Sequence, residues 1–157
     1  MKPNIEISNK NMKEVGELLN ILLADEYLLY TKTRNAHWNI QGSHFYELHT
    51  FFEAQYGILS VLIDDTAERV RALGHFAIGT LKGFLKVTRL SEINEEFKDR
   101  EQVLQALLED HETIIRSLRK DIGSVGDDFK DIGTADFMTG LMEKHEKMAW
   151  MLKSHLQ

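Results

Sequence analysis

The sequence predicts an all-α protein whose single domain, residues 1–157, is a four-helix bundle. Three observations lead to this prediction. A chain of 157 residues is of ordinary size for one domain. It contains one proline, Pro3, and is rich in Leu, Glu and Lys, which favours helices. Apolar residues also recur at helical spacing in four long segments.

The first two helices are predicted on either side of the segment WNIQGS. The first runs from about Asn9 to His37. Gly42 is expected to form the turn, Ser43 to cap the second helix, and Gly74 to end it. The expected core positions are Val15, Leu18, Leu19, Leu22, Leu29 and Ala36, followed by Phe45, Leu48, Phe52, Leu59, Leu62, Ile63, Val70 and Leu73.

A long connection separates the second and third predicted helices. It runs from His75 to about Arg89, and its segment GTLKGFLKV predicts a short extra helix. Ser91 is expected to cap the third helix, GSVGDDFKDIG to form a loop, and Thr134 to begin the fourth helix. The connection is long enough to run the length of the bundle, as in a ferritin-like topology.

The composition excludes several classes of protein. Without Cys, the chain can form no disulfide and no Cys-ligated zinc or iron–sulfur site. Its first 16 residues lack an apolar signal core, and no apolar run approaches the roughly 20 residues that span a bilayer. We therefore expect a cytoplasmic protein with no membrane partner. The net charge of −6 disfavours nucleic acid as a general partner and favours cations.

Two pairs of potential metal ligands lie on the second predicted helix. His49 and Glu53 are four residues apart and share a face, and Asp64 and Glu68 repeat this spacing. Glu53 and Asp64 are 11 residues apart, close to three turns, so both pairs lie on one stripe. The two pairs cannot reach one ion, because that spacing spans roughly 16 Å whereas metal–ligand bonds are about 2 Å.

A second copy of the helix could complete the site. If it runs antiparallel about a two-fold axis near Gly57 and Ile58, the first pair of one subunit faces the second pair of the other. The resulting dimer would hold two equivalent sites. Gly57 favours this arrangement, because glycine inside a helix costs about 1 kcal/mol and is better explained by close helix approach. His37 could turn in as a further ligand.

Histidine and carboxylate ligands suit iron, manganese or zinc. The chain has no Glu-x-x-His motif, which di-iron proteins commonly carry within one bundle, so a site between chains is favoured. Two alternatives stay open. The ligand pairs could belong to a solvated surface, with Asp65 and Arg69 forming a charged cluster around Asp64 and Glu68. The bundle could also bind zinc or manganese without turnover.

Three segments resemble the Dps family, the mini-ferritins: HWNIQGSHFYELHTFFE, DDTAERVRALG and GTADFMTGLMEKHEKMAWML. The resemblance covers nearly the whole chain. It implies a ferritin-like four-helix bundle with a short extra helix in the long connection, and a hollow shell of twelve identical subunits. It also implies a ferroxidase site between two-fold-related subunits. The implied ligands are His37, His49 and Glu53 from one subunit and Asp64 and Glu68 from the other. Many family members have Asp in place of Glu53.

The implied reaction is the oxidation of Fe²⁺ by hydrogen peroxide, with two iron ions possible at each site, and storage of ferric mineral in the cavity. Trp38 resembles a family Trp that intercepts stray oxidising equivalents, although packing is its expected main role. Asp131 and Asp136 are candidates for an acidic three-fold pore; the alternative is a charged helix start. His111 and His145 are expected to be satisfied core histidines.

A second function is a DNA-compacting or DNA-protecting role in which iron binding is secondary. A basic tail would favour it, and none is evident: residues 1–16 carry three Lys and two Glu. DNA binding is therefore expected to be weak or absent at neutral pH, because affinity for duplex DNA depends mainly on neutralising phosphates.

Overall fold

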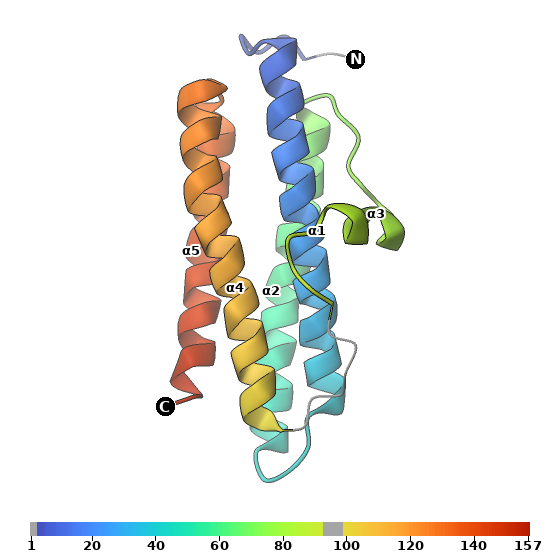
Figure 1. Cartoon of the computed structure of the whole chain (residues 1–157), viewed down its shortest axis with the longest axis vertical. Coiled ribbons are helices and arrows are strands. Elements are labelled where there is room, and N and C mark those ends of the chain that lie inside the picture. The colour runs from blue at the N-terminus through green and yellow to red at the C-terminus, as the bar shows by residue number, and fades with distance from the viewer. Residues whose placement is uncertain (1–2, 93–98) are drawn as a thin grey trace.

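Four long helices form a bundle in the computed structural model, which describes residues 3–92 and 99–157 (Figure 1). They are α1 (Asn9–Asn39), α2 (Phe45–Ala72), α4 (Arg100–Gly123) and α5 (Ile132–Ser154). A short helix, α3 (Leu81–Val87), lies in the connection between α2 and α4, and a π-helical turn, η1 (Ser124–Asp128), follows α4. No strand occurs in the described ranges. The predicted fold class is confirmed.

The helices pack as two antiparallel pairs, α1 with α2 and α4 with α5 (Figure 1). The connection after α2 returns along the bundle before α4 begins, and α3 packs against α1 on the way. Two glycines allow the chain to end α1 and α2 sharply, because Gly42 and Gly74 have φ of 100° and 82°. The predicted turn residue and the predicted end of α2 are therefore confirmed.

A buried network holds the end of the long connection against α1. The carboxylate of Asp25, fully buried on α1, accepts bonds from Thr88 Oγ1 (2.8 Å), from the backbone N–H of Arg89 (2.6 Å) and from Arg89 Nε (2.6 Å). Arg89 also donates to Asp121 of α4. Bonds to charged groups are about twice as strong as neutral ones, so this network fixes the approach of the connection to α4.

Apolar side chains from all four long helices fill the core. Most predicted core positions are buried, and each buried Leu or Phe contributes about 1.5–3 kcal/mol by leaving water. Phe45 is an exception, since it is 44% exposed at the start of α2. The largest fully buried side chains are Leu19, Leu22, Leu23, Leu29, Leu48, Phe52, Leu59, Leu62, Leu73, Leu104, Leu107 and Ile114.

The predicted starts of α2 and α4 are wrong. Ser43 does not cap α2; the helix begins after His44, whose side chain makes no capping bond. Ser91 does not cap α4 either, because Asp99 precedes that helix and accepts a bond from the backbone N–H of Gln102. The Ser91 carbonyl instead accepts a bond from Lys32 Nζ.

The junction between α4 and α5 also differs from the prediction. The segment GSVGDDFKDIG is not simply a loop, since η1 continues from α4 in a wider π-helical turn. The last helix begins at Ile132, two residues before Thr134, and Asp131 is its N-cap. None of the helices in the described ranges is long and apolar enough to cross a membrane.

Candidate metal centre

Two predicted ligands, His37 and His49, face each other where α1 ends and α2 begins. Their rings stack with centroids 3.7 Å apart. His37 Nδ1 lies 2.8 Å from the carbonyl oxygen of His49, and His49 Nδ1 lies 2.9 Å from that of His37. A carbonyl oxygen can only accept, so each Nδ1 carries the proton. In the neutral imidazole with this tautomer, Nε2 keeps its lone pair, which is the form in which imidazole binds a metal.

The turn between the two helices makes this reciprocal pairing possible. Ile40 ends α1 by donating its N–H to the carbonyl of Ala36, and Gly42 then reverses the chain with a positive φ. His49 follows His37 by 12 positions, so within this separation the chain returns to the end of α1. The turn sequence is therefore part of the predicted site.

The three predicted carboxylate ligands, Glu53, Asp64 and Glu68, lie exposed along α2. Within the parts of the chain that the structure describes, no group of three or more His, Asp or Glu side chains could hold a metal ion. A single subunit thus brings together only the two histidines. This agrees with the spacing along the helix, and the assignment of all five residues as ligands stays a prediction.

Between the carboxylates, α2 presents an apolar surface. Ile58 and Val61 are 42% and 55% exposed, and a Cβ built on Gly57 would meet no atom within 4 Å. The close approach expected at Gly57 is therefore not made within the chain. Gly57 and Val61 share a helix face with the carboxylates at either end, and Ile58 borders that face. This surface offers a second copy an apolar centre with charged ends.

Next to the histidines, Trp38 is 61% exposed, so it is not a core residue of the single chain. Its ring lies against Arg34, whose guanidinium carbon is 4.8 Å from the ring centroid. Tyr56 completes the surroundings: its hydroxyl is 3.5 Å from Glu53 Oε1, and its ring meets His37 edge-on. Sequence reasoning missed Tyr56, although it lies one helical turn after Glu53.

Comparison of the chain with known proteins identifies its family. The profile of the ferritin-like domain family matches residues 16–157. An uncharacterised low temperature-induced protein of Nostoc sp. is 44% identical, over 98% of this chain and 86% of that protein. DNA protection during starvation protein 2 of Bacillus anthracis is 33% identical, over 92% of this chain and 97% of that protein.

Solved structures give the same result. The Dps protein of Vibrio cholerae O1, described as a member of a broad superfamily of ferritin-like diiron-carboxylate proteins, matches with a TM-score of 0.91. It is 30% identical, and the match covers 100% of this chain and 98% of that one. This chain belongs to the Dps family.

In this Dps-family protein the two pore candidates differ in environment. Asp136 is exposed, whereas Asp131 is 2% exposed and caps α5. The Asp131 carboxylate accepts bonds from Thr134 N (2.9 Å) and Thr134 Oγ1 (2.6 Å), and it lies 3.5 Å from Arg69 Nη2. These bonds occupy both oxygens of Asp131. The pore assignment of Asp131 and Asp136 stays a prediction, and Asp136 is the residue whose carboxylate solvent can reach.

The centre of this Dps bundle holds a polar layer with one residue from each long helix: Glu26, Thr66, His111 and His145, all fully buried. Thr66 Oγ1 donates to Glu26 Oε2 (3.0 Å), and His145 Nε2 lies 3.5 Å from Glu26 Oε1. His145 Nδ1 also pairs with His111 Nδ1 (3.0 Å). The satisfied core histidine expected at His145 is confirmed.

His111 is less well satisfied, because its Nε2 is buried with no hydrogen-bond partner. Burial and the neighbouring His145 hold the pKa of His111 well below its ordinary value. The imidazole is therefore neutral in the folded protein near pH 7. Nothing in the sequence around either residue identifies the pair, which forms only when α4 and α5 pack together.

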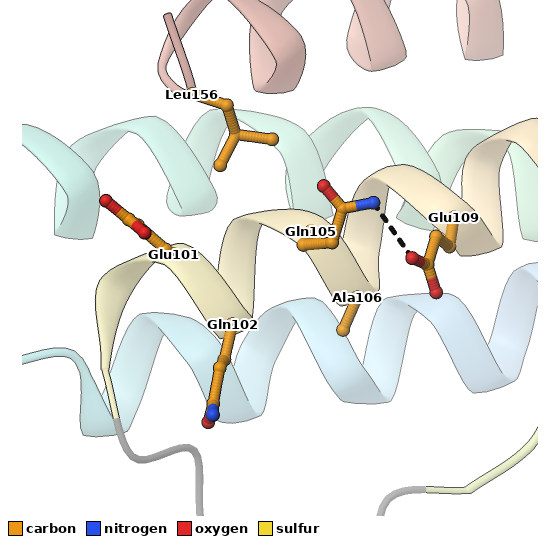
Figure 2. Close-up of a pocket in the computed structure, with 6 residues that line it drawn as sticks. All are labelled: Glu101, Gln102, Gln105, Ala106, Glu109 and Leu156. Atoms are coloured by element: carbon orange, nitrogen blue, oxygen red, sulfur yellow. Dashed lines mark hydrogen bonds between the residues drawn. The ribbon is translucent and has the colours of Figure 1, made fainter.

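A surface groove lies near the start of α4 and the C-terminal end of the chain (Figure 2). Along α4 at one side of this groove, Gln105 donates to Glu109 Oε1 at 2.8 Å. None of the predicted ligands lines this groove, so it takes no part in the candidate site. Its lining consists of Glu101, Gln102, Gln105, Ala106, Glu109 and Leu156.

Proposed function

We propose that the protein is a ferroxidase and an iron store. Two copies pack α2 against α2 in antiparallel orientation. His37, His49 and Glu53 of one subunit then face Asp64 and Glu68 of the other, and each such site binds up to two Fe²⁺ ions as substrate.

The observation that carries the proposal is the reciprocal bonding of His37 and His49. Backbone carbonyls hold both Nδ1–H groups, so two Nε2 lone pairs are available without any change of tautomer. Imidazole with carboxylates suits Fe²⁺, and the hard anionic oxygens favour Fe³⁺ more strongly. The exposed apolar face around Gly57 supports the second subunit as the source of the remaining carboxylates.

The oxidant that we propose is hydrogen peroxide. Two Fe²⁺ ions supply the two electrons that reduce one peroxide, with two protons, to two water molecules. A pair of ions at one site therefore avoids the one-electron reduction that releases hydroxyl radical. Protection against oxidative damage follows from this stoichiometry. Trp38, exposed beside His37, is proposed to intercept oxidising equivalents that escape.

Iron storage requires an enclosed space. We propose a shell of twelve subunits, built on two-fold dimers, that holds ferric mineral in the cytoplasm. Exposed carboxylates attract Fe²⁺ and raise the rate of its capture. Asp136 is proposed to line a pore for Fe²⁺, together with Asp131 if its cap contacts open.

Fe²⁺ oxidation, followed by the near-ultraviolet absorbance of ferric products, tests the proposal. Wild type should oxidise Fe²⁺ faster with peroxide under nitrogen than with air alone. Asp64→Asn should lower the rate at least about tenfold, since even groups that only support ligands contribute 10–100-fold. Asp65→Asn is the matched control, because Asp65 is exposed beside Asp64 and is not a predicted ligand. Equal rates in the two variants would contradict the proposal.

A second candidate function comes from the relatives. Those of Bacillus anthracis and Helicobacter pylori are named DNA protection during starvation proteins. Protection of DNA requires either direct binding or removal of iron and peroxide. For this chain we propose the second route, since its net charge of −6 opposes contact with phosphates.

A further inference from the structure

Arg34 is the centre of an aromatic cluster beside the candidate metal site. Its guanidinium carbon lies 4.8 Å from the ring centroid of Trp38, 5.2 Å from that of Tyr56 and 5.6 Å from that of Tyr30. Its Nη1 also donates to the Tyr30 hydroxyl at 2.8 Å. A cation over an aromatic face is attracted by the negative charge density of the ring. Arg34 thus ties Tyr56 of α2 to α1.

Tyr56 contacts two of the predicted ligands. Its hydroxyl donates to Glu53 Oε1 at 3.5 Å, one turn back along α2. Its ring meets the ring of His37 edge-on, with centroids 5.2 Å apart and planes at 79°. The side chain therefore links a carboxylate ligand and an imidazole ligand of the same subunit.

The contact with the carboxylate matters because of the length of Glu53. Glutamate has one more rotatable bond than aspartate, so fixing its carboxylate at a metal costs more conformational entropy. A phenol that donates to one oxygen removes part of this freedom before the metal arrives. Oε2 and the remaining lone pairs of Oε1 stay available, because a carboxylate accepts at about four positions.

We propose that Tyr56 is a positioning residue of the metal site: it orients the Glu53 carboxylate and is itself held by Arg34. The inference rests on the proposed function. It explains how the chain uses the longer Glu53 at a position where a shorter acid would need no such support. The ring of Tyr56 accounts for its packing, so its hydroxyl is the group whose role can be tested separately.

The first experiment measures binding of Co²⁺, a redox-inert probe of the site, by calorimetry and by its visible absorption spectrum. Tyr56→Phe keeps the ring and removes the donor. It should weaken binding about three- to tenfold, as loss of one hydrogen bond does, and change the Co²⁺ spectrum. The apparent KM for Fe²⁺ should rise more than kcat falls. Tyr27→Phe is the control, because the Tyr27 ring stacks on Phe84 of α3 and holds neither Arg34 nor a predicted ligand.

A double-mutant cycle with Glu53→Asp separates positioning from general support. The aspartate carboxylate is one methylene shorter and should not reach the phenol, so Tyr56→Phe should have no further effect in that background. Wild-type affinity in Tyr56→Phe would overturn the inference, and so would an equal loss in both backgrounds. A wild type that neither binds Co²⁺ nor oxidises Fe²⁺ would overturn the proposed function and the inference together.

Discussion

At the scale of single residues, backbone carbonyls orient the two histidines of the candidate metal site. The carbonyls of His37 and His49 each fix the proton on the other imidazole, and the chain can reach this geometry only through a tight reversal. Gly42 makes that reversal with a φ of 100°, a backbone conformation that other residues rarely adopt. The geometry of the candidate site therefore depends on a glycine that binds nothing.

Replacement of Gly42 tests this dependence. Gly42→Ala should destabilise the fold by about 1–3 kcal/mol, as residues held in sparsely populated backbone regions do, and should weaken Co²⁺ binding. A steric clash of the new side chain does not cause the loss, because a Cβ built on Gly42 meets no atom within 4 Å. Urea unfolding gives the stability change. Gly123→Ala, in open space with a φ of −60°, is the control and should be neutral or stabilising. Equal stability of the two variants would show that the positive φ at position 42 causes no strain in the alanine variant.

At the scale of the helices, apolar spacing is sufficient to predict the four long helices and the core side of the first two. Spacing along α2 also indicates that one chain cannot complete the candidate metal site, and this stays a prediction. Helix ends were less predictable. Ser91 and Asp99 are both residue types that favour an N-cap, and the residue type alone does not choose between them; the structure has Asp99.

Contacts between helices were beyond sequence reasoning for a similar reason. The ring of Tyr56 meets Arg34 only because α2 packs against α1, and nothing local indicates that neighbour. His111 and His145 likewise pair only across α4 and α5. Helical spacing predicts which face of a helix a residue lies on. Which residue it contacts on the next helix depends on how the two helices pack.

The polar layer between helices predicts acid sensitivity. The pKa of His111 is lowered in the folded state, so the unfolded chain binds more protons once the pH falls below about 6.5. Stability from this residue is complete above that pH and is lost as the pH falls, by up to about 1.4 kcal/mol per pH unit.

Urea unfolding between pH 7.5 and 5 measures this loss. His111→Gln keeps a donor for His145 and removes the titrating group, so its stability should depend less on pH than that of wild type. His44→Gln is the control, since His44 is exposed. Parallel pH profiles of wild type and His111→Gln would show that the buried imidazole is not responsible.

At the scale of the whole molecule, net charge governs the interaction with DNA. Each chain carries −6, so a shell of twelve would carry −72 and repel phosphate. No shift of plasmid DNA is expected in a gel at pH 7.5 and 150 mM salt. At most weak binding is expected near pH 6 in low salt, where histidines gain protons. A tight complex that survives 150 mM salt at pH 7.5 would instead favour direct DNA compaction.

The sharing of one metal site by two subunits is the central claim, and mixing two inactive variants tests it most directly. His49→Ala and Asp64→Ala should each be nearly inactive alone. A mixed dimer combines the intact His49 of one chain with the intact Asp64 of the other at one of its two sites. After random exchange of equal amounts, about a quarter of the wild-type rate of Fe²⁺ oxidation should return. No recovery, in a sample that native mass spectrometry shows to contain mixed assemblies, would contradict a shared site.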